Sequence, residues 1–296
     1  MNFNKYQHVE KLGHRNVKGI ETGSCHIFPK LDGTNGSIWK DEEGIQCGSR
    51  NRKLSEGKDN HGFWKHVNEH ENYKGFFAAY PNLRLFGEWL VPHTLKTYAD
   101  DAWRKFYIFD VTDSNGKHIH YDDYQGILLD HWLEFVPCMR VIRNPDLQDL
   151  HRCLEENKFL IKDGEGSGEG IVIKNYDFTN IDGRQNWAKI VTNEFKGKHQ
   201  RDSKPPTTDK KIVEDAIIDE FCTEHFIRKE FAKIESQYPD GFENRMIPEL
   251  LGRIYYEFIV EESWSFIKKH KNPIIDYRRL QQLMNIKIKE TLTEIF

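Results

Sequence analysis

The chain has 296 residues, of which 30% are charged, and a formal net charge of −4 at pH 7. These values exclude a strong global basic field, so any contact with nucleic acid must come from a local patch. The five cysteines are scattered without CxxC spacing, and no run of about 18 apolar residues occurs. We therefore predict a cytoplasmic protein in a reducing compartment, without a cysteine zinc site, a disulfide framework or a membrane partner.

Short apolar or alternating runs, bounded by Gly, Asn and Asp, recur from residue 24 to about 195 and predict strands. The tetrads DEEG (41–44) and DSNG (113–116) predict hairpin turns between strands. Helical periodicity interrupts this texture at about 60–80, 120–133 and 146–157. Because regular βαβ alternation is missing, the pattern predicts an α+β domain of mostly antiparallel sheets with flanking helices.

The texture changes after this region. Residues 196–211, KGKHQRDSKPPTTDKK, are polar, locally basic and contain prolines, which is typical of a linker. Three helical segments follow, near 210–236, 245–271 and 276–294. We predict a first domain over 1–200, a linker over 201–211 and a small all-α C-terminal domain over 212–296.

Lys30 raises the first functional question, because it lies between an apolar run and a Gly-Thr-Asn-Gly turn, with Asp32 two positions on. A lysine amine is a nucleophile only when unprotonated, and burial or a neighbouring cation produces that form. Gly33 and Gly36 are expected to let the backbone approach a ligand, and Asn35 adds hydrogen-bonding groups. The alternative is a solvated turn lysine.

Further charged and aromatic residues lie at strand ends of the same predicted domain. Cations suit ribose or phosphate, carboxylates suit Mg²⁺, and a ring can stack on a purine. Taken singly, each has a plainer explanation: a satisfied strand carboxylate, a core ring or an ordinary strand-end lysine. These candidates are Arg50, Glu88, Phe109, Glu169, Lys174 and Lys189.

The histidines offer no comparable signal. The chain has fourteen of them, without HExxH or other metal spacing. We expect the pairs His66/His70 and His118/His120 to be exposed.

Five segments in chain order resemble the motifs of the covalent nucleotidyltransferase superfamily, which contains DNA ligases, RNA ligases and capping enzymes. The resemblance covers about residues 20–198, and the joint pattern is far more specific than any single match. The matching segments are KLDG (30–33), FGE (86–88), FD (109–110), EGIVIK (169–174) and Lys189.

The resemblance implies a role for each matched position. Lys30 would attack the α-phosphate of ATP to form a lysyl-AMP, and Lys174 and Lys189 would stabilise the charge on that phosphate. Glu88 and Glu169 would hold Mg²⁺ or Mn²⁺. The implied ATP pocket comprises Phe28, Lys30, Asp32, Asn35, Arg50, Glu88, Phe109, Glu169, Lys174 and Lys189, with Phe109 stacked on adenine.

Within the superfamily, the chain looks most like RNA ligases of the RNA ligase 2 type. Those proteins begin almost directly with the nucleotidyltransferase (adenylation) domain and end in a small helical domain, whereas DNA ligases and capping enzymes carry an OB-fold. The resemblance implies an ATP-dependent RNA ligase of RNA repair that joins 5′-phosphate and 3′-hydroxyl RNA ends, with a monomer as the default. A DNA ligase and a non-catalytic RNA-binding protein on a degenerate domain remain alternatives.

One position departs from the pattern of that group, which usually ends in Lys-x-Lys. Here Lys189 is followed by Ile190 and Val191. Either Lys189 alone suffices, or Lys196 or Lys198 replaces the missing lysine, or one reaction step is weakened.

Overall fold

The computed structural model describes residues 1–91, 98–191, 213–235, 238 and 242–296. Among these, residues 1–91 and 98–191 belong to one compact unit and residues from 213 onward to a second. The predicted linker, 201–211, and the wider stretch 196–211 lie outside the described residues. Each unit is described by itself.

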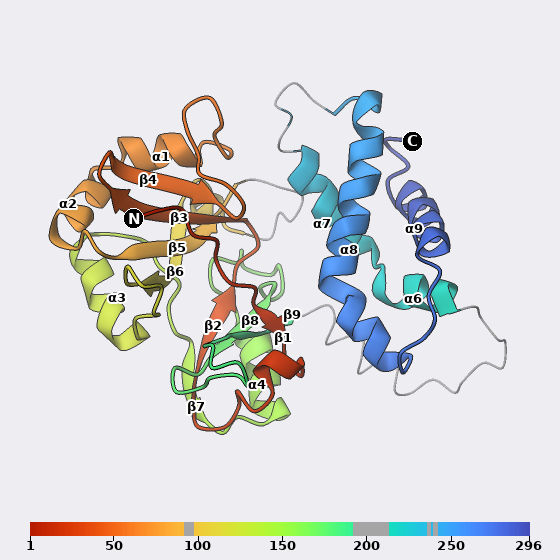
Figure 1. The fold of residues 1–296 in the computed structure, drawn as a ribbon, viewed down its shortest axis with the longest axis horizontal. Coiled ribbons are helices and arrows are strands. Elements are labelled where there is room, and N and C mark those ends of the chain that lie inside the picture. The colour runs from red at the N-terminus through yellow and green to blue at the C-terminus, as the bar shows by residue number, and fades with distance from the viewer. Residues whose placement is uncertain (92–97, 192–212, 236–237, 239–241) are drawn as a thin grey trace. The chain divides into compact units, whose positions relative to one another are not determined.

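Two sheets form the frame of the first unit (Figure 1). One has the strand order β1-β9-β8-β2-β7 and the other the order β4-β3-β5-β6. All pairings are antiparallel except β1 with β9, so the predicted fold class is confirmed. The strands are β1 (Glu10–Lys11), β2 (Ser24–Lys30), β3 (Thr34–Asp41), β4 (Gly44–Ser49), β5 (Arg84–Trp89), β6 (Phe106–Thr112), β7 (Arg140–Arg143), β8 (Gly170–Lys174) and β9 (Ala188–Val191).

Side-chain alternation along β2 separates core from site. Cys25 and Ile27 belong to an apolar cluster that also contains Leu150 and Leu154 of helix α4 (Leu147–Glu156). Alternate residues of a strand point to opposite faces, so His26, Phe28 and Lys30 share the other face. The β2 sequence thereby directs Lys30 away from the α4 side of the sheet.

The predicted helices of this unit are present. α1 and α2 contact β4, and α4 contacts β8. α4 begins with a reciprocal capping box between Asp146 and Asp149, which satisfies amide groups left free at a helix start. The other helices are α1 (Phe63–Glu69), α2 (Glu71–Ala79) and α3 (Tyr121–Asp130), with short 3₁₀ turns at Arg15–Val17 and Asp100–Ala102.

The segment before β1 was given no role by sequence reasoning, yet it packs on the second sheet. The Phe3 ring lies 5.9 Å from the Trp39 ring, and the Tyr6 ring lies 5.0 Å from the Phe86 ring. Arg84 donates a hydrogen bond to the Asn2 carbonyl. Residues 1–9 therefore cover the face of β3 and β5 that carries Trp39, Arg84 and Phe86.

Two local expectations need correction. The DEEG turn connects β3 to β4 as predicted, but the DSNG turn closes only an isolated bridge, Thr112–His118, before α3 begins. The Asp113 carboxylate accepts hydrogen bonds from the Asn115 and Lys117 amides. The predicted turn is therefore present, but the strand expected after it is not. β1 and β7 were not anticipated, because strands of two and four residues carry little periodicity.

The second unit is helical, as predicted. Its core consists of apolar side chains such as Ile217, Leu250, Phe258 and Met284. The first predicted segment is two helices, because the Thr223 hydroxyl accepts a hydrogen bond from the Phe226 amide and starts a new helix there. The elements are α6 (Val213–Phe221), α7 (Glu224–Glu235), a 3₁₀ turn (Asn244–Met246), α8 (Ile247–Lys269) and α9 (Tyr277–Thr291). Nowhere in the described chain is a helix both long and apolar enough to span a bilayer.

Candidate active site

Lys30 is the last residue of β2 and pairs with Gly170, the first residue of β8. The preceding residue, Glu169, places its Oε2 atom 2.5 Å from the Lys30 ammonium nitrogen. The Glu169 side chain is 5% exposed and that of Lys30 is 22% exposed. The predicted nucleophile and the carboxylate of the EGIVIK motif therefore meet at the end of one strand pair, although they are 139 residues apart.

The turn after Lys30 connects the two sheets. The Gly33 amide donates a 3.0 Å hydrogen bond to Glu88 Oε1, and the Asp32 amide donates a 2.8 Å bond to the Tyr98 hydroxyl. A Cβ atom on Gly33 would lie 2.6 Å from the Trp89 carbonyl oxygen, and one on Gly36 would lie 2.7 Å from the Phe63 ring. These glycines were expected to admit a ligand, but here they admit neighbouring protein atoms.

Glu88 of β5 lies in the field of several charges. Burial raises its pKa to about 7, with Glu169 and Asp32 adding to the rise and Lys30 opposing it. A carboxyl group with this pKa changes charge near neutral pH. Glu88 thus lies close enough to both Lys30 and Glu169 to interact with them electrostatically.

Replacing Glu88 with glutamine is expected to stabilise the ligand-free protein above pH 7. The pKa of Glu88 is higher in the folded state than in the unfolded state, so the folded state binds more protons. The free energy of unfolding therefore falls as the pH rises from about 4.5 to about 7. This pKa difference corresponds to about 3 kcal/mol, and glutamine can still accept the Gly33 hydrogen bond. Denaturant unfolding at several pH values measures the free energy of unfolding of both proteins. The same pH dependence of that free energy in both would contradict the prediction.

The third predicted lysine lies on the same sheet face. Register places Lys30, Gly170 and Val191 in one row across β2, β8 and β9. Lys189 lies two rows further along, beside Val172. Residues paired across antiparallel strands share a face, so Lys189 and Val191 both belong to the Lys30 face. Val191 therefore occupies the row of Lys30, and Lys196 and Lys198 lie outside the described residues.

Phe109 is displaced from the regular ladder of β6. Gly87 pairs with Ile108 and Phe86 pairs with Asp110, so Phe109 is an extra residue in a bulge. Its carbonyl oxygen accepts hydrogen bonds from the Lys174 ammonium at 2.5 Å and from the Tyr124 hydroxyl at 3.0 Å. Phe109 as a whole is partly buried, and its ring centre lies 5.0 Å from that of Tyr6, so stacking on a purine stays a prediction.

Lys174 is placed differently from Lys30. Its ammonium lies 2.7 Å from Asp110 Oδ1 and 4.7 Å from the centre of the Phe28 ring, and its side chain is 2% exposed. Burial lowers the pKa of Lys174, and Asp110 opposes that change. In this conformation Lys174 neutralises a buried carboxylate, so its catalytic role stays a prediction.

Asp110 is the centre of a buried polar cluster that sequence reasoning did not anticipate. Besides Lys174, its carboxylate accepts hydrogen bonds from Trp187 Nε1 at 2.9 Å and from the Tyr6 hydroxyl. Although burial raises the pKa of Asp110, Lys174 and His118 lower it below its usual range. The cluster connects the N-terminal segment and β6 with β8 and with Trp187, the residue before β9.

The remaining predicted ATP contacts come from several strands of the first unit. Asn35 pairs with Glu88 in the sheet register, and Arg50 follows β4 with its guanidinium 3.3 Å from His8 Nδ1. Phe28 is 1% exposed, packs in the core and lies under the Lys174 ammonium. Of the residues missed, Tyr98 supports the Asp32 turn, and no local pattern marks a tyrosine that acts from 66 residues away.

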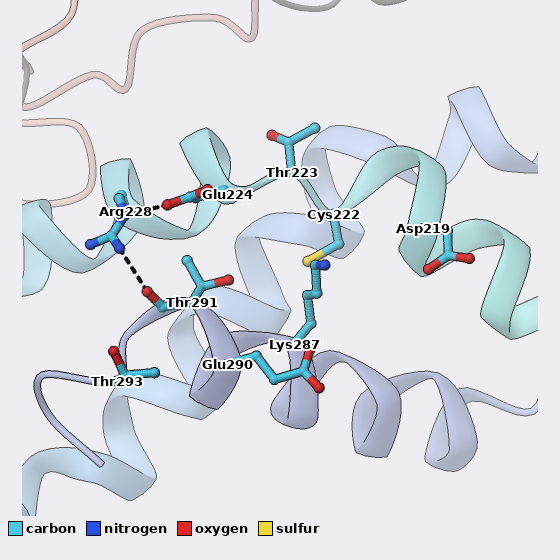
Figure 2. Close-up of a pocket in the computed structure, with 9 residues that line it drawn as sticks. All are labelled: Asp219, Cys222, Thr223, Glu224, Arg228, Lys287, Glu290, Thr291 and Thr293. Carbon is cyan, nitrogen blue, oxygen red and sulfur yellow. Dashed lines mark hydrogen bonds and ion pairs between the residues drawn. The ribbon is translucent and has the colours of Figure 1, made fainter. Parts of the chain in front are cut away.

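A cavity of about 430 Å³ lies in the helical unit (Figure 2). Arg228 is held there by Glu224 Oε1 and the Thr291 carbonyl oxygen, at 2.9 Å and 2.8 Å. Burial raises the pKa of the Cys222 thiol to about 12, which makes thiolate chemistry unfavourable. Two cations, Arg228 and Lys287, are balanced by Asp219, Glu224 and Glu290, so the lining does not favour phosphate.

Comparisons with solved structures identify the fold. The chain is similar to an RNA ligase of Naegleria gruberi with pyrophosphate, with 18% identity and a TM-score of 0.50. Mutants of that protein with ATP and manganese, and with AMP and manganese, match at 18% and 19% identity, each with a TM-score of 0.51. Each match covers 67% of this chain and 58% of the N. gruberi chain.

No protein in a curated collection matches the chain. A family model described as RNA ligase matches residues 24–191, which include β2 through β9 and every predicted site residue from Phe28 to Lys189. This match extends over more than half of the 296 residues and confirms the family expected from the motifs. The chain therefore belongs to the RNA ligase family.

Proposed function

We propose that this protein is an ATP-dependent RNA ligase that joins 5′-phosphate and 3′-hydroxyl ends through a covalent AMP on Lys30. The observation that carries the proposal is the meeting of Lys30 with Glu169 at 2.5 Å, beside a turn whose Gly33 amide is bound by Glu88. Family membership and the shared fold support it.

The first step follows from the position of Lys30. Its nitrogen loses a proton and attacks the α-phosphorus of ATP, a P–N bond forms, the α–β P–O bond breaks, and pyrophosphate leaves. Glu169 Oε2, 2.5 Å from that nitrogen, orients the amine and can accept the proton. The AMP then passes to the 5′-phosphate of an RNA end, and a 3′-hydroxyl displaces it.

Glu88 and Glu169 are the side chains that would hold a divalent cation. Both are carboxylates beside Lys30, and Mg²⁺ is commonly bound by one or two carboxylates together with substrate phosphates. When bound, the cation reduces the negative charge around the phosphates. Among similar structures, mutants of the N. gruberi ligase hold manganese with ATP or with AMP.

Other predicted site residues would contact the adenine, the ribose and the phosphates of ATP. Phe109, which is partly buried, supplies an aromatic ring for adenine, and Asn35 and Arg50 supply polar contacts for ribose or phosphate. Lys189 lies two rows from Lys30 on the same sheet face and supplies positive charge to the reacting phosphate.

The test begins with ATP labelled on the α-phosphate, incubated with the full-length protein and Mg²⁺ and then separated on a denaturing gel. We expect a covalent label with ATP and none with GTP. Any AMP already attached is first discharged with pyrophosphate. Sealing is then compared on nicked RNA and nicked DNA duplexes, with faster sealing of RNA expected. No label, or a preference for DNA, would contradict the corresponding part of the proposal.

Replacing Lys189 with methionine is expected to slow AMP attachment on the order of 100-fold or more, because a positive charge near the reacting phosphate is lost. Methionine retains the apolar stem, which matters because Lys189 is 9% exposed. The rate is measured in a single turnover, with Lys65→Ala on the exposed face of α1 as the control. An unchanged rate would show that another cation stabilises the charge on the reacting phosphate.

A further inference from the structure

A cluster of possible metal ligands lies on the Lys30 face of the first unit, away from the carboxylates of the proposed site. His26, His120 and Asp122 each offer one ligand atom, and these atoms all lie within 4.8 Å of one another. His26 comes from β2, whereas His120 and Asp122 come from the start of α3. Lys30 lies four positions after His26 in β2, which corresponds to about 13 Å along the strand.

His26 supplies the observation that points to a ligand. Its side chain belongs to a residue that is 5% exposed, and its Nδ1 atom has no hydrogen-bond partner among the described residues. A buried polar atom without a partner is uncommon and needs an explanation.

The geometry around His26 allows a shared ligand. The His26 and His120 rings meet edge to face with their centres 4.9 Å apart, and His120 Nδ1 lies 3.6 Å from Asp122 Oδ2. Ligand atoms around a tetrahedral zinc ion lie about 3.4 Å apart, so small side-chain rotations close the cluster. Lys174, opposite His26 in the register, is already neutralised by Asp110.

We infer that His26, His120 and Asp122 form a site for a divalent transition metal such as Zn²⁺, which joins β2 to the start of α3. Two imidazoles and one carboxylate suit zinc, with water as the remaining ligand, and differ from the oxygen ligands that Mg²⁺ prefers. Coordination through His120 Nδ1 would replace the 3.2 Å hydrogen bond that this atom accepts from the Asp122 amide. The site is distinct from the cation proposed at Glu88 and Glu169.

The test measures Zn²⁺ binding to metal-free, full-length protein by calorimetry and by the rise in melting temperature. His120→Asn keeps an acceptor at the start of α3, and Asp122→Asn removes the carboxylate charge. The matched control is Asp123→Asn, which changes the neighbouring exposed residue of the same helix turn. Circular dichroism without metal confirms that all variants are folded.

We expect the unmodified protein and Asp123→Asn to bind one more zinc ion than His120→Asn or Asp122→Asn, and to gain thermal stability from it. Co²⁺ in the same site is expected to give the visible absorption of a tetrahedral complex. Lys30→Ala is expected to bind zinc as the unmodified protein does, so the zinc site can be tested independently of AMP attachment. Equal zinc binding in either ligand variant and the unmodified protein, or none in the unmodified protein, would overturn the inference.

Discussion

Lys30→Ala is expected to abolish covalent AMP attachment completely. The ATP-dependent sealing of RNA ends is expected to be lost with it. The alanine variant lacks the nitrogen that forms the P–N bond, and no rearrangement of Glu169 or Glu88 can replace that atom. The measurement is incorporation of label from α-labelled ATP, with Lys65→Ala as the exposed-lysine control.

Lys30→Arg separates a nucleophile from a structural cation. Arginine retains the positive charge and can pair with Glu169, but it is not deprotonated in proteins and cannot attack phosphorus. We expect no label with arginine either. A labelled arginine variant would show that another residue carries the AMP.

A second substrate distinguishes loss of the attacking amine from misfolding of the Lys30 variants. RNA that already carries AMP on its 5′-phosphate bypasses the attack by Lys30, since the remaining step is displacement of AMP by the 3′-hydroxyl. We expect Lys30→Ala to seal this RNA while failing with ATP. Failure on both substrates, in a variant with unchanged thermal unfolding, would assign Lys30 a role in RNA binding or in the last step.

Asp110→Asn is expected to destabilise the first unit by about 3–5 kcal/mol, because it leaves the Lys174 ammonium buried without its counter-ion. Asp110 is completely buried and also accepts hydrogen bonds from Trp187 and Tyr6, so the amide of asparagine would face donors. Denaturant unfolding measures the loss, and the exposed Asp130→Asn in α3 is the control.

The double variant Asp110→Asn with Lys174→Met tests the charge pair itself. Replacing both members of a buried ion pair by neutral groups is often close to neutral in stability, whereas removing one member is costly. We therefore expect the double variant to be more stable than the sum of the two single losses predicts. Additive losses would show that Asp110 and Lys174 stabilise the fold through other contacts.

The same double variant tests the predicted catalytic role of Lys174. If its ammonium serves the α-phosphate, AMP attachment fails even when the fold is retained. If it serves to hold the Phe109 carbonyl and neutralise Asp110, attachment persists with a weaker affinity for ATP. Single-turnover rates at increasing ATP concentration distinguish the two results.

The site was predictable from sequence to the extent that its chemistry follows strand ends and turns. Lys30 ends β2, and Glu169 immediately precedes β8, and both positions were recognisable from the apolar runs beside them. The register that pairs Lys30 with Gly170 then brings the two side chains together. Val191 was recognised as a departure, but its place in the Lys30 row became clear from β8 and β9 pairing.

The buried clusters were not predictable in the same way. The histidine pairs were expected to be exposed, but the His118 side chain is 10% exposed beside Asp110, and His66, His70 and His120 are partly buried. His26 showed no metal spacing because its possible co-ligand His120 lies on a separate element. Such contacts depend on how one sheet packs on another, which no short sequence window contains.

The sequence by itself determined the α+β class, the helical character of the C-terminal segment and the RNA ligase family, because periodicity, turn residues and ordered motifs are local properties. It also identified Lys30, Glu88 and Glu169 as candidates. Tertiary structure decided that Lys174 neutralises Asp110 and that Tyr6 reaches the same carboxylate from 104 residues away. Register and sheet packing bring those groups together, and in a buried setting each charge requires a partner.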